Sequence, residues 1–180
     1  SSEYSTVQLA FLRALVALFF IGPMLMRNGL GVMKTTVFPI HLFRSVLTYS
    51  AMLTWFYAVS VIPVSDYTAL LYIQPIFTIL LAVLILGEKA GPKTWLAVAA
   101  AFVGALIILR PGFQEISLGM LAAIATGFLF AGVNTAVKFL SRTDSSAVIV
   151  AYVNILILIL SLIPAYFYWK DPVVGDVPAI

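Results

Sequence analysis

The chain has 180 residues, of which 63% are hydrophobic and only 9% are charged, whereas about 25% of the residues of an ordinary soluble domain are charged. This composition excludes a soluble protein, because one core of this size could not bury so much apolar surface, and it predicts an integral membrane protein. The net charge is +3 and there is no cysteine, which excludes disulfides, thiolate metal sites and cysteine nucleophiles from these residues.

Six apolar runs are each long enough to cross a bilayer as a helix, which takes about 20 residues. They occupy approximately residues 8–26, 42–61, 66–86, 93–109, 117–139 and 147–168. The runs are apolar on all sides, whereas the strands of a membrane barrel alternate polar and apolar residues. The sequence therefore predicts an all-α membrane protein, built as a bundle of six transmembrane helices.

The first run carries a single charge, Arg13. Ionisable groups inside a membrane are costly and usually face the interior of the bundle. We interpret Arg13 as a contact for an anionic group of a substrate. The alternatives are that it snorkels to the outer headgroups or pairs with a carboxylate such as Asp66.

The second run has a face of hydroxyl and aromatic side chains at helical spacing. Its members are Ser45, Thr48, Met52 and Trp55, with Tyr49 beside them. Such a face could line a substrate cavity. Ordinary helix packing is the alternative.

The third run contains a proline at its centre. Pro75 removes a backbone donor and clashes with the carbonyl of Leu71, so we expect a kink and a freed acceptor. Gln74 and Thr78 share one helix face with Leu71. A kink and an amide at this depth predict a polar patch for a substrate, and the alternative is a purely structural kink.

Polar residues between the runs are candidates to cap the helices. Ser65 or Asp66 is expected to cap the third helix, and Asp144 or Ser145 the sixth. Glu88 ends the third helix, where a carboxylate is disfavoured by the helix dipole. We expect Lys89, Lys93 or the start of the fourth helix to offset its charge.

Small residues recur every four positions in the fourth and fifth runs and predict close packing between helices. They are Ala97, Ala101 and Ala105, and Gly119, Ala123, Gly127 and Ala131. Two amides, Asn134 in the fifth run and Asn154 in the sixth, are candidate cavity donors, with hydrogen bonds between helices as the alternative. Lys138, near the end of the fifth run, is expected to snorkel to the membrane surface.

Basic residues gather in the loops on one face of the predicted bundle. They are Arg27, Lys34, Arg44, Lys89, Lys93, Lys138 and Arg142, with His41 in the same loops, whereas the other face has Arg110 and Lys170. The positive-inside rule places the basic loops in the cytoplasm and both ends of this segment outside. Topology therefore explains the basic balance, and we expect no nucleic-acid partner.

The stretch from Arg44 to Pro111 resembles EamA-type transporters of the drug/metabolite transporter superfamily. The matching text is FYAVSVIPVSDYTALLYIQPIFT followed by LILGEK, a tryptophan and a glycine before RP. These features are Ala58, Pro63, Pro75, Gly87-Glu88-Lys89, Trp95 and Gly104. The resemblance implies a ten-helix bundle of two inverted five-helix repeats, which moves metabolites by alternating access.

Against that family pattern, residues 1–112 resemble helices two to five of the first repeat, and residues 113–180 the first two helices of the second. We therefore expect an incomplete copy of a ten-helix transporter, which the family implies lies in a bacterial inner membrane. The alternative is a six-helix protein that forms a homodimer to complete its pathway.

The leading hypothesis is a secondary transporter for a small metabolite or drug-like molecule, without a cofactor or metal. Its candidate substrate-binding residues are Arg13, Tyr49, Trp55, Gln74, Thr78, Asn134 and Asn154, with Pro75 as the kink. One alternative is a scaffold subunit whose polar groups pair from helix to helix. An intramembrane enzyme is disfavoured, because the sequence shows no nucleophile, metal-ligand or phosphate-binding motif.

Overall fold

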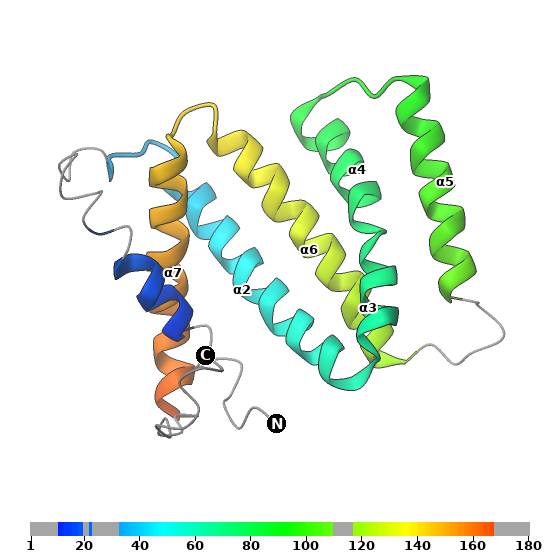
Figure 1. Ribbon diagram of the computed structural model, residues 1–180. Helices are drawn as coiled ribbons and strands as arrows, with labels where there is room; N and C mark the ends of the chain where they lie inside the picture. The colour runs from blue at the N-terminus through cyan, green and yellow to red at the C-terminus, as the bar shows by residue number, and fades with distance from the viewer. Residues whose placement is uncertain (1–10, 20–21, 23–32, 110–116, 168–180) are drawn as a thin grey trace. The chain divides into compact units, whose positions relative to one another are not determined.

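The computed structural model describes residues 11–19, 22, 33–109 and 117–167, in which all regular secondary structure is helical (Figure 1). Residues 11–19 form the first described helix. The helices that follow are α2 (Phe38–Val61), α3 (Val64–Leu71), α4 (Gln74–Leu86), α5 (Pro92–Leu109), α6 (Leu118–Leu140) and α7 (Ser146–Phe167). The predicted all-α fold is therefore confirmed.

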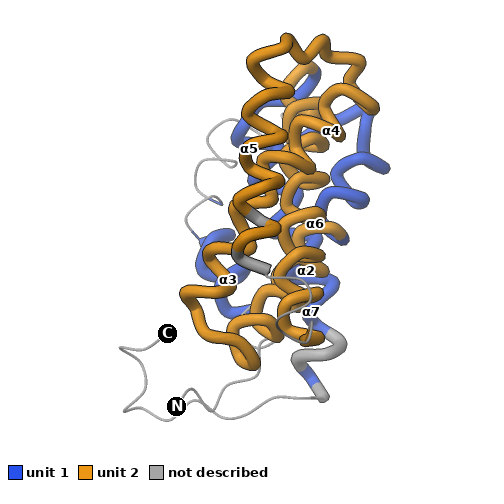
Figure 2. The backbone as a smooth tube through the Cα atoms, turned by 90° about the vertical axis from the view of Figure 1, so that its right-hand side faces the viewer, with its two compact units in different colours: residues 1–46, 143–180 blue, residues 47–142 orange. Residues whose placement is uncertain are grey.

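The helices divide into two compact units, coloured separately in Figure 2. Unit 1 contains residues 1–46 and 143–180, and unit 2 contains residues 47–142. Unit 2 therefore holds most of α2 and all of α3, α4, α5 and α6. Unit 1 holds residues 11–19, the first turns of α2, and α7.

Two stretches of the described residues are long and apolar enough to cross a membrane. They are Val64–Leu86, which takes α3 and α4 together, and Leu118–Leu140, which is α6; a shorter apolar stretch covers Ser146–Leu162. The number of six spans stays a prediction.

The third apolar run is broken in the middle, as Pro75 predicts. Tyr72 N donates to Ala69 O at 3.3 Å and Ile73 N donates to Leu70 O at 3.1 Å, which are the tight three-residue bonds of a helix end. Pro75 then occupies the first turn of the new helix, where a missing N–H is harmless. The structure thus has two helices, α3 and α4, where we predicted one kinked helix.

The expected cap of α3 is wrong. Pro63, in an extended conformation, precedes α3 without a side-chain cap, and Ser65 and Asp66 lie inside the first turn. This happens because the Pro63 carbonyl already accepts from the Asp66 and Tyr67 amides at 3.0 Å. Asp144, one of the two residues expected to cap α7, binds the side chains of Thr35 and His41 through Oδ2, and the cap of α7 stays a prediction.

In unit 2, α6 packs against α3 and α4, and α5 packs against the same two helices. Figure 1 shows α6 and α5 on opposite sides of them. The small-residue face of α6 is buried, as predicted; its members are Gly119, Ala123, Gly127 and Ala131. On α5 the prediction fails in part, since Ala97 is exposed, whereas Ala101 packs beside Ile73 and Ile76. The Ala105 side chain lies outside the described residues.

Candidate functional site

The break between α3 and α4 lies against the backbone of α6. Gly127 makes this approach possible: a Cβ added there would lie 3.5 Å from Ile73 Cγ2 and 3.7 Å from the Cα of Gln74. These are ordinary contact distances, so a methyl group fits and a longer side chain would push the helices apart. The two ends of the broken helix therefore lie next to a residue of α6 that has no side chain, Gly127.

Two of the predicted polar residues begin α4 at this break. Gln74 and Thr78 are both half-buried, one turn apart. The Thr78 hydroxyl donates to the Gln74 carbonyl at 3.0 Å, which occupies that donor within the helix. The bond to Thr78 uses the main chain of Gln74, so the side-chain amide of Gln74 remains able to bind a solute.

A buried pair of hydroxyls joins α2 to α6 beside the same glycine. Thr126 is 0% exposed, and its Oγ1 lies 2.9 Å from Thr54 Oγ1 and 2.8 Å from Ala122 O, so its one proton is shared between these two acceptors. Thr126 is the residue before Gly127, so α2, α4 and α6 all bring polar groups to one level of unit 2. The pairing of these two threonines could not be predicted, because they are 72 positions apart in the sequence and only the fold brings them into contact.

Aromatic rings lie on the same three helices. The rings of Phe77 on α4 and Phe128 on α6 meet edge to face, with centroids 5.5 Å apart. On α2, the ring centroids of Trp55 and Phe56 are 4.7 Å apart, and Trp55 is partly exposed. Aromatic faces of this kind can stack on planar rings of a solute. Tyr49, one and a half turns before Trp55, is half-buried in the same unit.

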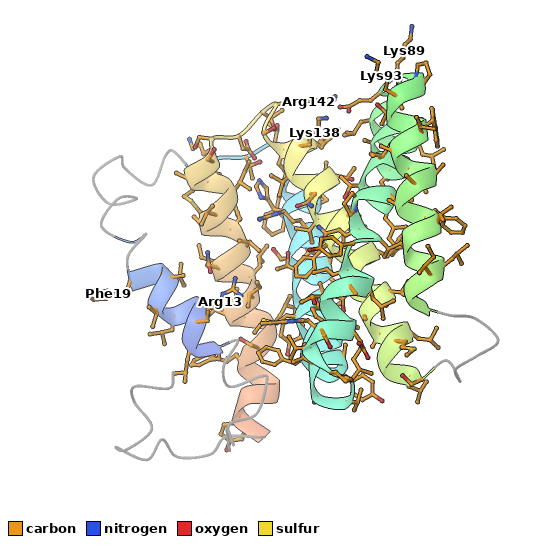
Figure 3. All side chains as sticks on the ribbon, turned by 45° about the vertical axis from the view of Figure 1, so that its right-hand side comes forward. Arg13, Phe19, Lys89, Lys93, Lys138 and Arg142 are labelled. Atoms are coloured by element: carbon orange, nitrogen blue, oxygen red, sulfur yellow. The ribbon has the colours of Figure 1, made fainter. Side chains whose placement is uncertain are left out.

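Of the other three predicted residues, Arg13 and Asn154 belong to unit 1 and Asn134 belongs to unit 2. Arg13 is exposed on the helix of residues 11–19 in unit 1 (Figure 3). Asn134 is exposed on α6. Asn154 of α7 donates through Nδ2 to Val150 O at 2.8 Å, so its amide is bound to its own helix.

Glu88 pairs with Lys138, which was not among its expected partners. Its carboxylate oxygens lie 2.6 and 2.7 Å from Lys138 Nζ at the end of α6. The expected partners Lys89 and Lys93 extend from the same end of unit 2 (Figure 3). The expectation is therefore wrong, because the packing of α4 on α6 brings Lys138 to the turn after Gly87.

A second cluster, in unit 1, was not predicted at all. His41 was expected in a loop, but it lies in the first turn of α2 and is 1% exposed. Its Nε2 is 2.7 Å from Asp144 Oδ2, which also accepts from Thr35 Oγ1 at 2.8 Å. The ring of Tyr152 stacks on the imidazole, with the two ring centroids 4.4 Å apart. A single histidine and an acidic residue on the same predicted face were the available signal.

No group of three histidine, cysteine, aspartate or glutamate side chains within the described ranges is arranged to hold a metal ion. The polar groups described beside the break, Gln74, Thr78, Thr54 and Thr126, are neutral hydroxyls and an amide. They can bind and orient an uncharged or weakly charged solute, but they offer no pair of acid and base for covalent chemistry.

The pattern of the EamA-like transporter family matches residues 1–110 of the chain. A riboflavin transporter from Brucella anthropi is 34% identical over 84% of the chain and 54% of its own length. A riboflavin transporter from Vibrio cholerae is 30% identical over 95% of the chain and 60% of its own length. An S-adenosylmethionine uptake transporter from Rickettsia bellii is 27% identical over 92% of the chain and 57% of its own length.

The chain thus spans somewhat more than half the length of the curated relatives that it matches. No solved structure matches it with statistical significance.

Proposed function

Because the chain belongs to the EamA-like transporter family, we propose that the protein is a secondary transporter that moves a small organic solute across a membrane by alternating access. One structural observation carries the placement of its pathway. The broken helix α3–α4 packs on Gly127 of α6, where the Cα of Gln74 would lie 3.7 Å from an added Cβ, so the break meets α6 at a residue without a side chain.

The break supplies polar groups where a continuous helix would have none. Pro75 cannot donate to the Leu71 carbonyl, so an acceptor is freed beside the Gln74 amide. Irregular backbone at this depth is tolerated where it is covered by protein or lines a cavity. In our proposal Gln74, Tyr49 and Trp55 contact the solute, and Thr54, Thr78 and Thr126 shape the wall.

The proposed solute is riboflavin or another molecule with a planar heteroaromatic ring. Its support is the identity to two riboflavin transporters, at 34% and 30%. The aromatic residues Trp55, Phe77 and Phe128 in the same unit suit stacking on such a ring. S-adenosylmethionine, which also contains a planar ring, is the second candidate, since a relative at 27% identity takes it up.

We also propose the orientation and repeat organisation that the sequence indicates. Lys89, Lys93, Lys138 and Arg142 extend from one end of unit 2 (Figure 3), which supports a cytoplasmic position for that end. The repeats would be residues 1–112 and 113–180, in a bacterial inner membrane. A homodimer is the alternative arrangement.

Riboflavin uptake by the complete protein tests the function. The protein is expressed in a bacterium that neither makes nor imports riboflavin, and uptake of labelled riboflavin is measured with and without excess S-adenosylmethionine. We expect uptake above the empty-vector level. If labelled riboflavin does not enter cells that contain well-folded protein, and labelled S-adenosylmethionine does not enter them either, the proposed solutes are contradicted.

The pathway is tested separately with Gln74→Ala. Losing one hydrogen bond of an amide to a bound solute is worth about 1 kcal/mol, so we expect roughly fivefold weaker apparent affinity. Leu84→Ala is the matched control, because Leu84 is 78% exposed on the same helix. Equal uptake kinetics in both variants and the wild type would remove Gln74 from the pathway.

A further inference from the structure

Unit 1 contains a cluster that we call the His41 junction, made of Thr35, His41, Asp144 and Tyr152. It ties three separate segments together: residues 33–35, the start of α2, and the start of α7. Both Thr35 and His41 bind the same carboxylate oxygen of Asp144, at 2.8 and 2.7 Å. The Tyr152 hydroxyl donates to Met33 O at 2.7 Å, while its ring covers the imidazole.

The hydrogen bonds define which nitrogen of His41 carries the proton. An ionised carboxylate only accepts, so Nε2 must donate to Asp144. The other ring nitrogen, Nδ1, is buried and has no hydrogen-bond partner among the described residues. As a bare lone pair it is tolerable there, because unmet acceptors are milder defects than unmet donors.

Adding a proton to Nδ1 changes this balance. The proton turns Nδ1 into a charged donor in a site where no described residue accepts a hydrogen bond from it. An unmet buried donor is strongly disfavoured, and more so when it is charged. If the junction opens, water can bind the new N–H group while Asp144 stays beside Nε2. Protonated His41 therefore favours the open junction, and neutral His41 favours the closed one.

We propose that His41 is a proton-binding site whose protonation opens the junction between residues 33–35, α2 and α7. Histidine is the side chain that, when unperturbed, changes charge between pH 5 and 8, so that is the range over which we test the junction. The proton site stands independently of transport. Its consequence, that solute movement depends on pH, rests on the proposed function.

The other charged and titratable groups of the junction act on His41 in two directions. Asp144 is a counter-charge beside Nε2 in both the closed and the open junction, so it stabilises the added charge in each. On α2, Arg44 is one turn from His41, with Nη1 donating to Ile149 O at 3.0 Å, and its positive charge opposes a second buried cation. In the segment before α2, Lys34 is exposed.

Labelling of a single cysteine reports on opening without any solute. Ser45→Cys places a thiol where the side chain is 0% exposed, one turn beyond His41 and bonded to its carbonyl. Ser146→Cys, exposed at the start of α7, corrects for the pH dependence of the thiol itself. These residues contain no cysteine, and any elsewhere in the complete protein is first replaced by serine.

We expect the maleimide labelling rate of the S45C protein, divided by that of the S146C protein, to rise about tenfold between pH 8 and pH 6. His41→Gln keeps an N–H group for Asp144 but cannot bind a proton, so the rise should disappear. A ratio that does not change with pH in the parent protein overturns the proposal, and so does a rise that persists in the His41→Gln protein.

Two further variants keep the test decisive if His41→Gln folds poorly. Asp144→Asn retains an acceptor and removes the counter-charge, so the rise should move to a more acidic pH. Tyr152→Phe retains the stacked ring and loses only the bond to Met33, so its rise should stay near the parental pH. Identical pH profiles for Asp144→Asn and Tyr152→Phe would contradict the proposal.

Riboflavin flux into proteoliposomes of the complete protein is then measured between pH 6 and pH 8. A pH-dependent labelling ratio without any flux would leave the proton site in place and refute the proposed function. Flux that is independent of pH, together with a constant labelling ratio, would refute the proton site alone.

Discussion

At the scale of single residues, the hydrogen bond from Thr126 to Thr54 joins α2 to α6 inside unit 2. Thr126→Val keeps the shape of the side chain and removes the bond, so the free energy of unfolding should fall by about 0.6–1.7 kcal/mol, the range of hydrogen bonds between membrane helices. Unfolding in detergent, followed by tryptophan fluorescence, measures this change.

Thr68→Val is the control for that substitution. The Thr68 hydroxyl is exposed and donates to Ser65 O of its own helix at 2.8 Å, so both variants lose a bond to the local main chain. Only Thr126→Val also loses a bond between helices. Equal losses of stability in the two variants would show that the bond to Thr54 contributes nothing.

The ion pair of Glu88 and Lys138 should contribute little to stability. Its side chains are 37% and 54% exposed, and exposed pairs are typically worth less than about 1 kcal/mol. We expect Glu88→Gln to shift the unfolding free energy by no more than that, and the shift to shrink further in high salt. A loss of several kcal/mol that is insensitive to salt would contradict this expectation.

Residue-level prediction from sequence succeeded where a residue acts on its own helix and failed where it acts on a distant one. Pro75 breaks its helix by local sterics, and that was predictable. The partner of His41 is 103 positions away, and that of Glu88 is 50 positions away. Such pairs depend on how helices are aligned in space, which hydropathy does not encode.

At the scale of whole helices, the end of α2 and the start of α6 approach closely at Gly119. A Cβ added there would lie 2.6 Å from both Val61 Cγ2 and Ile62 Cγ2. Gly119→Ala should therefore lower the unfolding free energy by about 1–3 kcal/mol, the usual effect of overpacking. Thermal unfolding of the purified protein provides the measurement.

Gly104→Ala is the comparison, since a Cβ added on α5 at Gly104 meets no atom within 4 Å. The same substitution in an open position should be neutral or slightly stabilising, because alanine favours helix. If Gly119→Ala were as stable as Gly104→Ala, the close approach of α2 and α6 would be wrong.

Removing the break should separate stability from transport. Pro75→Ala restores a main-chain donor for the Leu71 carbonyl, so α3 and α4 can join into one helix. We expect unchanged or greater stability and several-fold slower uptake of labelled riboflavin. Pro92→Ala at the first position of α5 is the control, and equal uptake by both variants would argue against a role for the break.

The helices themselves were largely predictable, because each is long and uniformly apolar. The predicted second, fourth, fifth and sixth runs begin or end within four residues of α2, α5, α6 and α7. Their caps were not predictable in the same way. Ser117 caps α6 by accepting from Met120 N at 3.2 Å, whereas Pro63 begins α3 with main-chain bonds alone, and the two choices depend on local backbone geometry.

At the scale of the whole molecule, the proposed topology makes a further prediction. Single cysteines at Lys89 and Ser65 replace exposed residues near opposite ends of the α3–α4 segment. In intact cells an impermeant maleimide should label the Ser65→Cys protein, and should label the Lys89→Cys protein only after the inner membrane is opened. The reverse pattern would invert the orientation given by the basic loops.

The two compact units do not follow the boundary between the predicted repeats, since α6 packs with α3 and α4 in unit 2. Repeats reflect ancestry and connectivity, whereas compact units reflect contact. The repeats stay a prediction, and the sequence could not have indicated which helices would pack together.

The close fit at Gly127 also bears on how such a protein can diversify. A methyl group is the largest addition that position accepts without moving the broken helix, whereas Trp55 and Gln74 have no comparable restriction. In a library that randomises all three positions and selects for uptake of a new compound, surviving clones should keep glycine or alanine at position 127. The clones should carry many different residues at positions 55 and 74. The crossing of the helices then stays the same while the transported compound changes.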